Sequence, residues 1–183
     1  MKKLIIGLGI VLLVGCHSSS GIIEYDNSVE ILSTGVDMSV YSGMDSTSHQ
    51  FLETNVKQLI EFVKNKGTGV FFFGQIGCRS CHLAIPVVDR VAKDSGVIVY
   101  YINSMNIDNS DYQEFVSLAT PILDTYQGEP TLFTPDLMVV KDGEFVGNYI
   151  GVGSDISGSL TSSQVDDLVF EYRKVLELLI DKE

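Results

Sequence analysis

Residues 70–82 read VFFFGQIGCRSCH. The four apolar residues VFFF are typical of a strand buried on both faces of a sheet, because they are continuous and do not alternate with polar residues. The letters GQIG then predict a turn, and the residues from Cys78 to about Asp94 follow a helical pattern. We therefore expect a buried strand over residues 69–73 that leads into a helix starting at Cys78.

The start of this helix carries two cysteines, Cys78 and Cys81, in a Cys-x-x-Cys motif. The unpaired N–H groups and the dipole at a helix N-terminus stabilise a thiolate and lower its pKa, and the charge of Arg79 acts in the same direction. Cys78 is thus the predicted attacking sulfur. Cys81, one turn further into the helix, is the predicted resolving thiol, which closes a disulfide and releases the product.

The same residues also match the Cys-x-x-Cys-His signal for attachment of a c-type haem. In that alternative His82 is the axial ligand, Met105 or Met138 is the sixth ligand, and the protein is an electron carrier. A zinc site is disfavoured, since two cysteines and one histidine within five residues lack the distant second pair of ligands that structural zinc sites use. We therefore predict no metal ligands.

The N-terminus reads MKKLIIGLGIVLLVGC. Two lysines precede an eleven-residue apolar stretch, which as a helix covers about 16 Å, roughly half of a bilayer core. This predicts a signal peptide over residues 1–15. The last four letters resemble the lipobox of bacterial lipoproteins, so Cys16 is the expected lipidation site and residues 16–21 a tether. An uncleaved signal anchor or a buried apolar segment is the alternative. The expected location is extracytoplasmic, anchored to the bacterial membrane as a lipoprotein.

Composition limits the partners. The chain has 183 residues, with 12 Lys and Arg against 24 Asp and Glu, a net charge of −12. Loss of Lys2 and Lys3 with the signal would leave ten basic residues and a charge of −14. So acidic a surface disfavours nucleic acid and anionic lipid, which leaves the lipid anchor as the expected membrane contact. The 168 residues after the signal fit one domain.

The flanking sequence predicts alternating helices and strands. Asp-Gly between two apolar runs is a strong hairpin signal, and periodic apolar residues indicate helices. The expected elements, in chain order, are an edge strand or hairpin within 22–45, a helix from about Thr47 with Leu52, Val56, Leu59 and Val63 on its apolar face, a strand over 97–102, a helix over 110–126 interrupted by Pro121, a hairpin of 137–140 with 144–150, and a final helix with a capping box of Ser163 and Asp166. Together they predict an α/β fold with a mixed sheet and helices on both faces.

The spacing of several residues resembles the thioredoxin superfamily. Its members carry a proline five residues after the second cysteine, where Pro86 stands here. They also carry a cis-proline that opens the next strand, six residues before a Lys-x-Gly turn, with a further glycine eight residues after the turn glycine. Pro135, Gly143 and Gly151 match these intervals, whereas Pro130 lies five residues too far from the turn. The resemblance implies a thioredoxin-like domain over residues 50–183, preceded by an N-terminal extension over 22–49.

The resemblance also implies a function. It is that of a thiol-disulfide oxidoreductase that uses the Cys78–Cys81 couple without another cofactor. Arg79, Ser80 and Pro86 would support the couple, and the backbone at Thr134 and Pro135 would bind an extended substrate peptide. The partners would be exported protein thiols or disulfides, with a membrane redox partner as a further candidate. The direction of electron flow stays open, and a non-enzymatic accessory or binding module with the same fold is an alternative.

The chain departs from the thioredoxin pattern in several places. Phe72 stands where thioredoxin carries a buried aspartate, Gly77 replaces the usual aromatic residue before the first cysteine, and the lysine of the next strand falls near Tyr100 or Tyr101. An insertion lies around residues 103–133. These differences predict a specialised exported relative and not a general cytoplasmic reductase.

Overall fold

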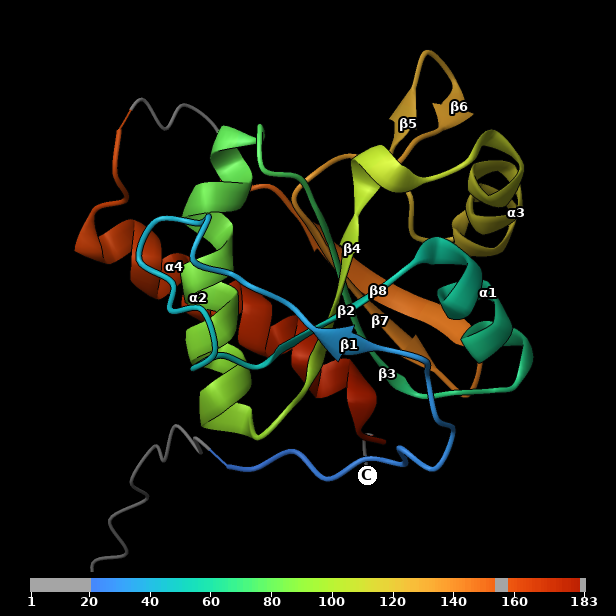
Figure 1. Cartoon of the computed structure of the whole chain (residues 1–183), viewed down its shortest axis with the longest axis horizontal. Helices are drawn as coiled ribbons and strands as arrows, with labels where there is room; N and C mark the ends of the chain where they lie inside the picture. The colour runs from blue at the N-terminus through green and yellow to red at the C-terminus, as the bar shows by residue number, and fades with distance from the viewer. Residues whose placement is uncertain (1–20, 154–157, 182–183) are drawn as a thin grey trace, which may run out of the picture.

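The computed structural model describes residues 21–153 and 158–181. Its centre is a six-stranded sheet in the order β1-β2-β4-β3-β7-β8 (Figure 1). Strands β2, β4 and β3 are parallel to one another, while β1, β7 and β8 are each antiparallel to their neighbour. The strands are β1 (Thr34–Gly35), β2 (Phe51–Thr54), β3 (Gly69–Gly74), β4 (Val99–Asn103), β7 (Asp136–Lys141) and β8 (Glu144–Ile150).

Helices cover both faces of this sheet (Figure 1). Helices α2 (Arg79–Ser95) and α4 (Ser162–Leu176) pack on one face, and α1 (Val56–Lys64) and α3 (Asn109–Ala119) pack on the other. A small hairpin of β5 (Thr125–Tyr126) and β6 (Glu129–Pro130) and two short 3-10 helices, η1 (Ser104–Asn106) and η2 (Glu177–Leu179), complete the fold. The α/β prediction of a mixed sheet between helices is confirmed, and the arrangement is thioredoxin-like.

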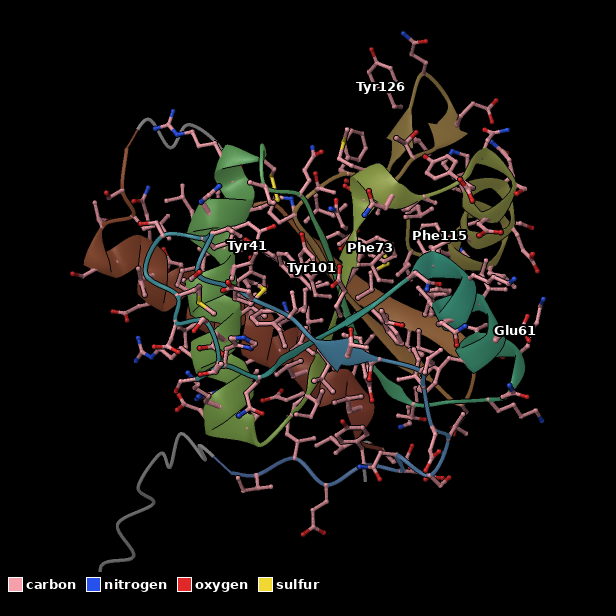
Figure 2. The ribbon with its side chains drawn as sticks, viewed as in Figure 1. Tyr41, Glu61, Phe73, Tyr101, Phe115 and Tyr126 are labelled. Carbon is pink, nitrogen blue, oxygen red and sulfur yellow. A yellow bond between two sulfur atoms is a disulfide. The ribbon has the colours of Figure 1, made fainter. Side chains whose placement is uncertain are left out.

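The central strand β3 explains why the sheet needs cover on both faces. Val70 and Phe72 point into the apolar cluster beneath α2 and α4, and Phe71 and Phe73 point into the cluster beneath α1 and α3. All four side chains are fully buried. Figure 2 shows Phe73 and Phe115 on the α3 side of the sheet. The prediction of a strand buried on both faces is confirmed.

Two helix starts differ from the sequence-based predictions. The helix expected from Thr47 begins at Val56, because Leu52 and its neighbours pair with β4 as strand β2 and Asn55 caps the helix by accepting a hydrogen bond from the Gln58 N–H. The capping box of α4 is formed by Thr161 and Gln164, two residues before the expected pair.

The interrupted helix and the last hairpin agree with the sequence-based predictions. The helix expected over 110–126, with its interruption at Pro121, ends at Ala119, because proline lacks a backbone N–H and its ring crowds the preceding turn. The hairpin of β7 and β8 is confirmed, with Asp142 and Gly143 at positive φ of 52° and 80°. A side chain at residue 143 would collide with the backbone carbonyl of Val63, so this turn also requires glycine for lack of space.

The N-terminal extension packs against the domain. The expected edge strand is confirmed as β1, which pairs with β2. Beyond it, Met38 and Tyr41 are fully buried beneath α2. The predicted signal peptide, Cys16 and most of the predicted tether lie outside the described residues. Within the two described ranges, no helix combines the length and the apolar character that crossing a membrane requires.

Candidate active site

The cysteine pair lies where β3 passes into α2. After Gly74 the chain turns, and the Cys78 N–H donates to the carbonyl of Gln75 at 3.1 Å. Cys78 is the N-cap of α2, as predicted, and its Sγ accepts the backbone N–H of Cys81 at 3.1 Å. Cys78 and Cys81 form a disulfide with their Cα atoms 5.2 Å apart. The backbone N–H that points at Cys78 Sγ would stabilise a thiolate on this sulfur after reduction.

The two sulfurs differ in exposure. Cys81 is fully buried in the apolar cluster beneath α2, while Cys78 is half-buried and open to one side. Arg79 is exposed and Ser80 half-buried in the first turn, and Pro86 lies inside α2, where it removes one backbone N–H. A substrate can therefore approach Cys78 but not Cys81.

The segment before β7 faces the disulfide. The peptide bond between Thr134 and Pro135 is cis, which confirms the choice of Pro135 over Pro130 as the cis-proline. The carbonyl oxygen of Thr134 lies 3.8 Å from Cys78 Sγ. Pro135 is fixed in turn, because its carbonyl accepts the Gly151 N–H at 2.8 Å. The fold thus brings Thr134 next to the sulfur of Cys78, although the two residues are 56 positions apart in the sequence.

Aromatic side chains fill the place beneath the disulfide where thioredoxin carries its acid. Phe72 is fully buried and stacks on Tyr101 of β4, with ring centroids 6.4 Å apart. The Tyr101 hydroxyl lies 2.7 Å from that of Tyr41, which comes from the N-terminal extension. Burial raises the pKa of both tyrosines, so both hydroxyls stay protonated. Sequence reasoning missed Tyr41, since nothing in the local pattern relates it to the cysteines.

Asp136 is a second residue that sequence reasoning missed. It directly follows Pro135, is fully buried, and accepts one hydrogen bond, from Asn148 Nδ2 to Oδ2 at 3.0 Å, while Oδ1 has no partner. Burial, with a smaller contribution from the charge of Asp124, raises the pKa of Asp136 to about 8, although the Asn148 bond acts against it. An acid at the head of the apolar run DLMVV was the signal in the sequence.

Asp136 does not replace the acid missing at residue 72. It lies opposite Phe73 in the pairing of β3 and β7, and directly opposed residues share a face of a sheet. Phe73 belongs to the cluster beneath α1 and α3, whereas Cys81 belongs to the cluster beneath α2 and α4. The acid and the resolving cysteine are therefore on opposite faces of the sheet.

The surroundings of His82 do not favour the haem alternative. His82 Nε2 lies 2.7 Å from the Ile76 carbonyl oxygen, to which it donates a hydrogen bond. Of the two candidate sixth ligands, Met138 is fully buried on the opposite face of the sheet and Met105 is 73% exposed. Within the described residues, no three His, Cys, Asp or Glu side chains are grouped as a metal site requires.

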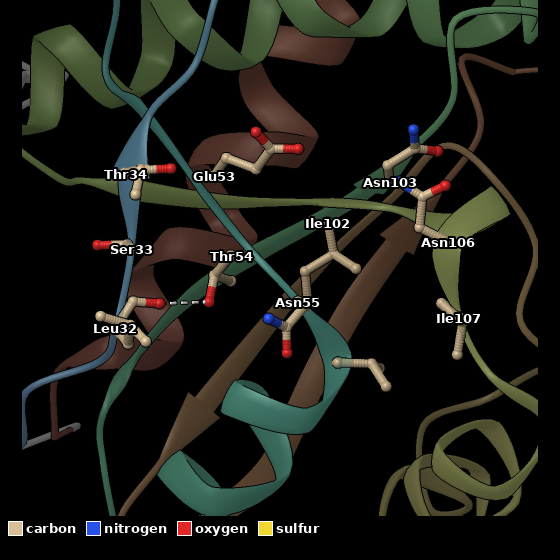
Figure 3. A pocket seen from close by; sticks show the side chains of 11 residues that line it. Leu32, Ser33, Thr34, Glu53, Thr54, Asn55, Ile102, Asn103, Asn106 and Ile107 are labelled. Atoms are coloured by element: carbon tan, nitrogen blue, oxygen red, sulfur yellow. Dashed lines mark hydrogen bonds between the residues drawn. The ribbon is translucent and has the colours of Figure 1, made fainter.

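A separate cavity of about 300 Å³ opens at the ends of β2 and β4 (Figure 3). Glu53, Asn55, Asn103 and Asn106 supply most of its polar lining. Two of these amides already cap helices, because Asn55 accepts from the Gln58 N–H and Asn103 from the Met105 N–H. Neither cysteine lines this cavity.

The matches of this chain to known proteins are to solved structures. No known family profile matches the chain, and no curated protein matches it. Among solved structures, oxidized thioredoxin O2 from Arabidopsis thaliana matches at 15% identity over 73% of this chain and 96% of that one, with a TM-score of 0.45. Thioredoxin f from spinach chloroplast matches at 15% identity over 71% and 99%, with a TM-score of 0.42.

A further match comes from a structural study of the thiol resolving mechanism of a yeast mitochondrial 1-Cys peroxiredoxin. Its identity is 16% over 58% of this chain and 86% of that one, with a TM-score of 0.39. Because these TM-scores lie below 0.5, the fold assignment rests on the strand order and on the geometry of the cysteines and the cis-proline. By those features the chain has a thioredoxin-like fold, with a disulfide at the start of α2 facing a cis-proline.

Proposed function

We propose that this protein is a membrane-tethered, extracytoplasmic thiol-disulfide oxidoreductase acting on protein disulfides or dithiols. The observation that carries the proposal is the meeting of three groups: a half-buried Cys78 at a helix N-terminus, a buried Cys81 bonded to it, and the Thr134 carbonyl 3.8 Å from Cys78 Sγ. This arrangement provides an attacking sulfur, a resolving sulfur and a backbone edge for a substrate.

The reducing half of the reaction has two steps. The Cys78 thiolate attacks one sulfur of a substrate disulfide, so that a mixed disulfide forms and the other substrate sulfur leaves as a thiolate and takes up a proton. Cys81 then loses its proton and attacks Cys78 Sγ, which restores the Cys78–Cys81 disulfide and releases the second substrate thiol. Two electrons pass from the dithiol to the substrate, and the same steps in reverse oxidise a substrate dithiol.

The surface around Cys78 suits a protein substrate. Ile76 is 57% exposed in the turn before Cys78, and Phe133 is 36% exposed directly before Thr134. An extended peptide that pairs with the backbone at Thr134 would place its cystine at Cys78 and its apolar side chains on these two residues. Arg79 adds a positive charge at the same edge.

The proposed location is supported by the sequence alone. The apolar stretch after Lys2 and Lys3 and the four letters that end in Cys16 support export and lipid attachment. Labelling cells with a palmitate analogue should modify the wild-type protein and not Cys16→Ser. Equal labelling of both would contradict the anchor without affecting the redox proposal.

Trapping of substrates tests the chemistry. Cys81→Ser removes the resolving sulfur, so it should accumulate mixed disulfides on Cys78 with exported proteins, seen as dithiothreitol-sensitive bands on non-reducing gels. Cys78→Ser/Cys81→Ser is the matched control and should show none. If Cys81→Ser forms no adducts and Cys78→Ser leaves the cellular phenotype unchanged, a binding module is the better account.

A further inference from the structure

The N-terminal extension follows α2 along one side. We define the strap as residues 38–50. The ring centroid of Tyr41 lies 5.0 Å from that of His82, and a Cβ on Gly43 would lie 3.9 Å from Cγ of Pro86. Further along, the strap forms hydrogen bonds with Asp89 and Lys93. These four α2 residues recur every three or four positions, which places them on one face of the helix.

The far end of the strap is held by polar bonds. Asp89 Oδ1 accepts the Gln50 N–H at 2.9 Å, and Lys93 Nζ donates to the Ser48 carbonyl at 2.6 Å. The two helix residues also form an ion pair with each other at 2.7 Å. The strap is thus fixed to the second half of α2, and Tyr41 is its contact with the first turn.

Tyr41 joins the first turn of α2 to the central strands (Figure 2). Its ring packs on His82, the residue after Cys81. Its hydroxyl pairs with Tyr101, and Tyr101 stacks on Phe72 of β3. Tyr41 is only 1% exposed and shares an apolar cluster with Cys81.

We propose that Tyr41 is a positioning residue of the redox site, which holds the first turn of α2 so that Cys81 stays buried and close to Cys78. This inference rests on the proposed function. When the dithiol closes, Cys81 Sγ bonds to Cys78 Sγ and two electrons and two protons pass to the oxidant. The more firmly the turn is held, the higher the effective concentration of one sulfur at the other, and the more the closed disulfide is favoured over mixed disulfides with small thiols.

The test measures the thiol-disulfide equilibrium of the full chain against reduced and oxidised glutathione. Tyr41→Leu should lower the equilibrium constant for disulfide closure about tenfold, the size expected when one or two residues of the turn regain conformational freedom. This corresponds to a potential about 30 mV less negative. Tyr41→Phe keeps the ring and loses only the hydroxyl pair, so we expect a change of about threefold, comparable to the loss of one net hydrogen bond.

Alkylation of the reduced chain gives a second readout, which reports how often the first turn of α2 opens and exposes Cys81. Peptide mapping after a short iodoacetamide pulse separates Cys81 from Cys78 and Cys16. In the wild type, Cys78 should react and Cys81 stay protected, whereas Tyr41→Leu should let Cys81 react as well. If Tyr41→Leu does not fold, Tyr41→Phe carries the test through its smaller shift.

Thr54→Val is the matched control. Thr54 Oγ1 donates to the Leu32 carbonyl at 2.8 Å, so this variant loosens the same N-terminal extension at β2, away from α2. It should leave both the glutathione equilibrium and the protection of Cys81 within about twofold of wild type. If the Tyr41 variants also stay within that range, the proposal is wrong. It is equally wrong if Thr54→Val changes the glutathione equilibrium and the protection of Cys81 as much as the Tyr41 variants do. If Cys81→Ser traps no exported protein, while the glutathione equilibrium of the chain with both cysteines still responds to Tyr41, the proposed function alone is refuted.

Discussion

The two faces of the sheet bury different polar groups. Beneath α2 and α4, the hydroxyls of Tyr41 and Tyr101 pair with each other near the disulfide. Asp89 is a buried acid on the same side, but it is paired with Lys93 and lies about two helical turns from Cys81 along α2. Beneath α1 and α3, Asp136 is buried with one carboxylate oxygen unpartnered. The redox face therefore keeps its ionisable acid at a distance, while the opposite face holds one that burial keeps mostly protonated at neutral pH.

Moving an acid to the redox face should have the largest effect. Phe72→Asp would remove a stacked ring and bury a carboxylate in an apolar cluster, and we expect it to lower the free energy of unfolding by about 4 kcal/mol or more. Urea denaturation measures this change. Phe170→Asp, at a position on α4 that is 65% exposed, is the control and should change it by less than about 0.5 kcal/mol. A small loss in Phe72→Asp would mean that water reaches this face.

Removing the acid from the opposite face should stabilise the protein at high pH. The pKa of Asp136, about 8 in the folded chain, lies above its ordinary value of 3.8. Between these values the folded chain holds one more proton than the unfolded chain, so stability falls as pH rises, by up to about 1.4 kcal/mol per pH unit. Asp136→Asn removes this slope.

We expect Asp136→Asn to gain a few kcal/mol of unfolding free energy at pH 9, because the slope accumulates between pH 3.8 and about pH 8, and little near pH 4. Urea denaturation across this range tests the expectation, with Asp108→Asn, an exposed acid whose side chain makes no capping hydrogen bond, as the control. An unchanged slope in Asp136→Asn would show that the carboxylate is solvated or paired.

Removing a hydroxyl from the redox face should have a smaller effect and no pH dependence. Tyr101→Phe leaves the Tyr41 hydroxyl without its partner at 2.7 Å, which should cost about 1–2 kcal/mol, equally at pH 5 and pH 8. Thermal unfolding at both pH values measures it. A loss of stability at only one of the two pH values would indicate that Tyr101 interacts with a titrating group and not only with the Tyr41 hydroxyl.

The smallest effect is expected at the helix caps, where the two faces should behave alike. Asn55 caps α1 on one face and Thr161 caps α4 on the other. Replacing either by alanine should cost about 1 kcal/mol by urea denaturation. A much larger loss of unfolding free energy in one of the two variants would mean that its helix contributes more to stability than the other.

The parts predicted well from the sequence are those with local signals. The apolar run before Cys78, the Asp-Gly turn and the spacing of Pro135 from that turn each depend on nearby residues, and the structure agrees with them. Strand β2 was mistaken for helix because Leu52 fits both periods and only pairing with β4 decides the outcome.

The polar groups of the site could not be predicted in the same way. Tyr41 lies 60 positions before Tyr101, and its contact exists only because the extension returns along α2. Asp136 was visible as an acid in an apolar strand, but its burial depends on the packing of β7 between β3 and β8. Long-range packing of this kind leaves no periodic trace in the sequence.

The contact between Ile23 of the N-terminal extension and the end of α2 bears on how the domain would be oriented relative to a membrane. Ile23 donates its N–H to the Ser95 carbonyl, at the end of α2 opposite the cysteines. The 17 residues of α2 span about 26 Å. With the proposed lipid on Cys16, the chain would enter the domain at its membrane-proximal pole and present the disulfide at the distal pole. In that orientation the site would suit partners that diffuse through the aqueous compartment better than partners embedded in the bilayer.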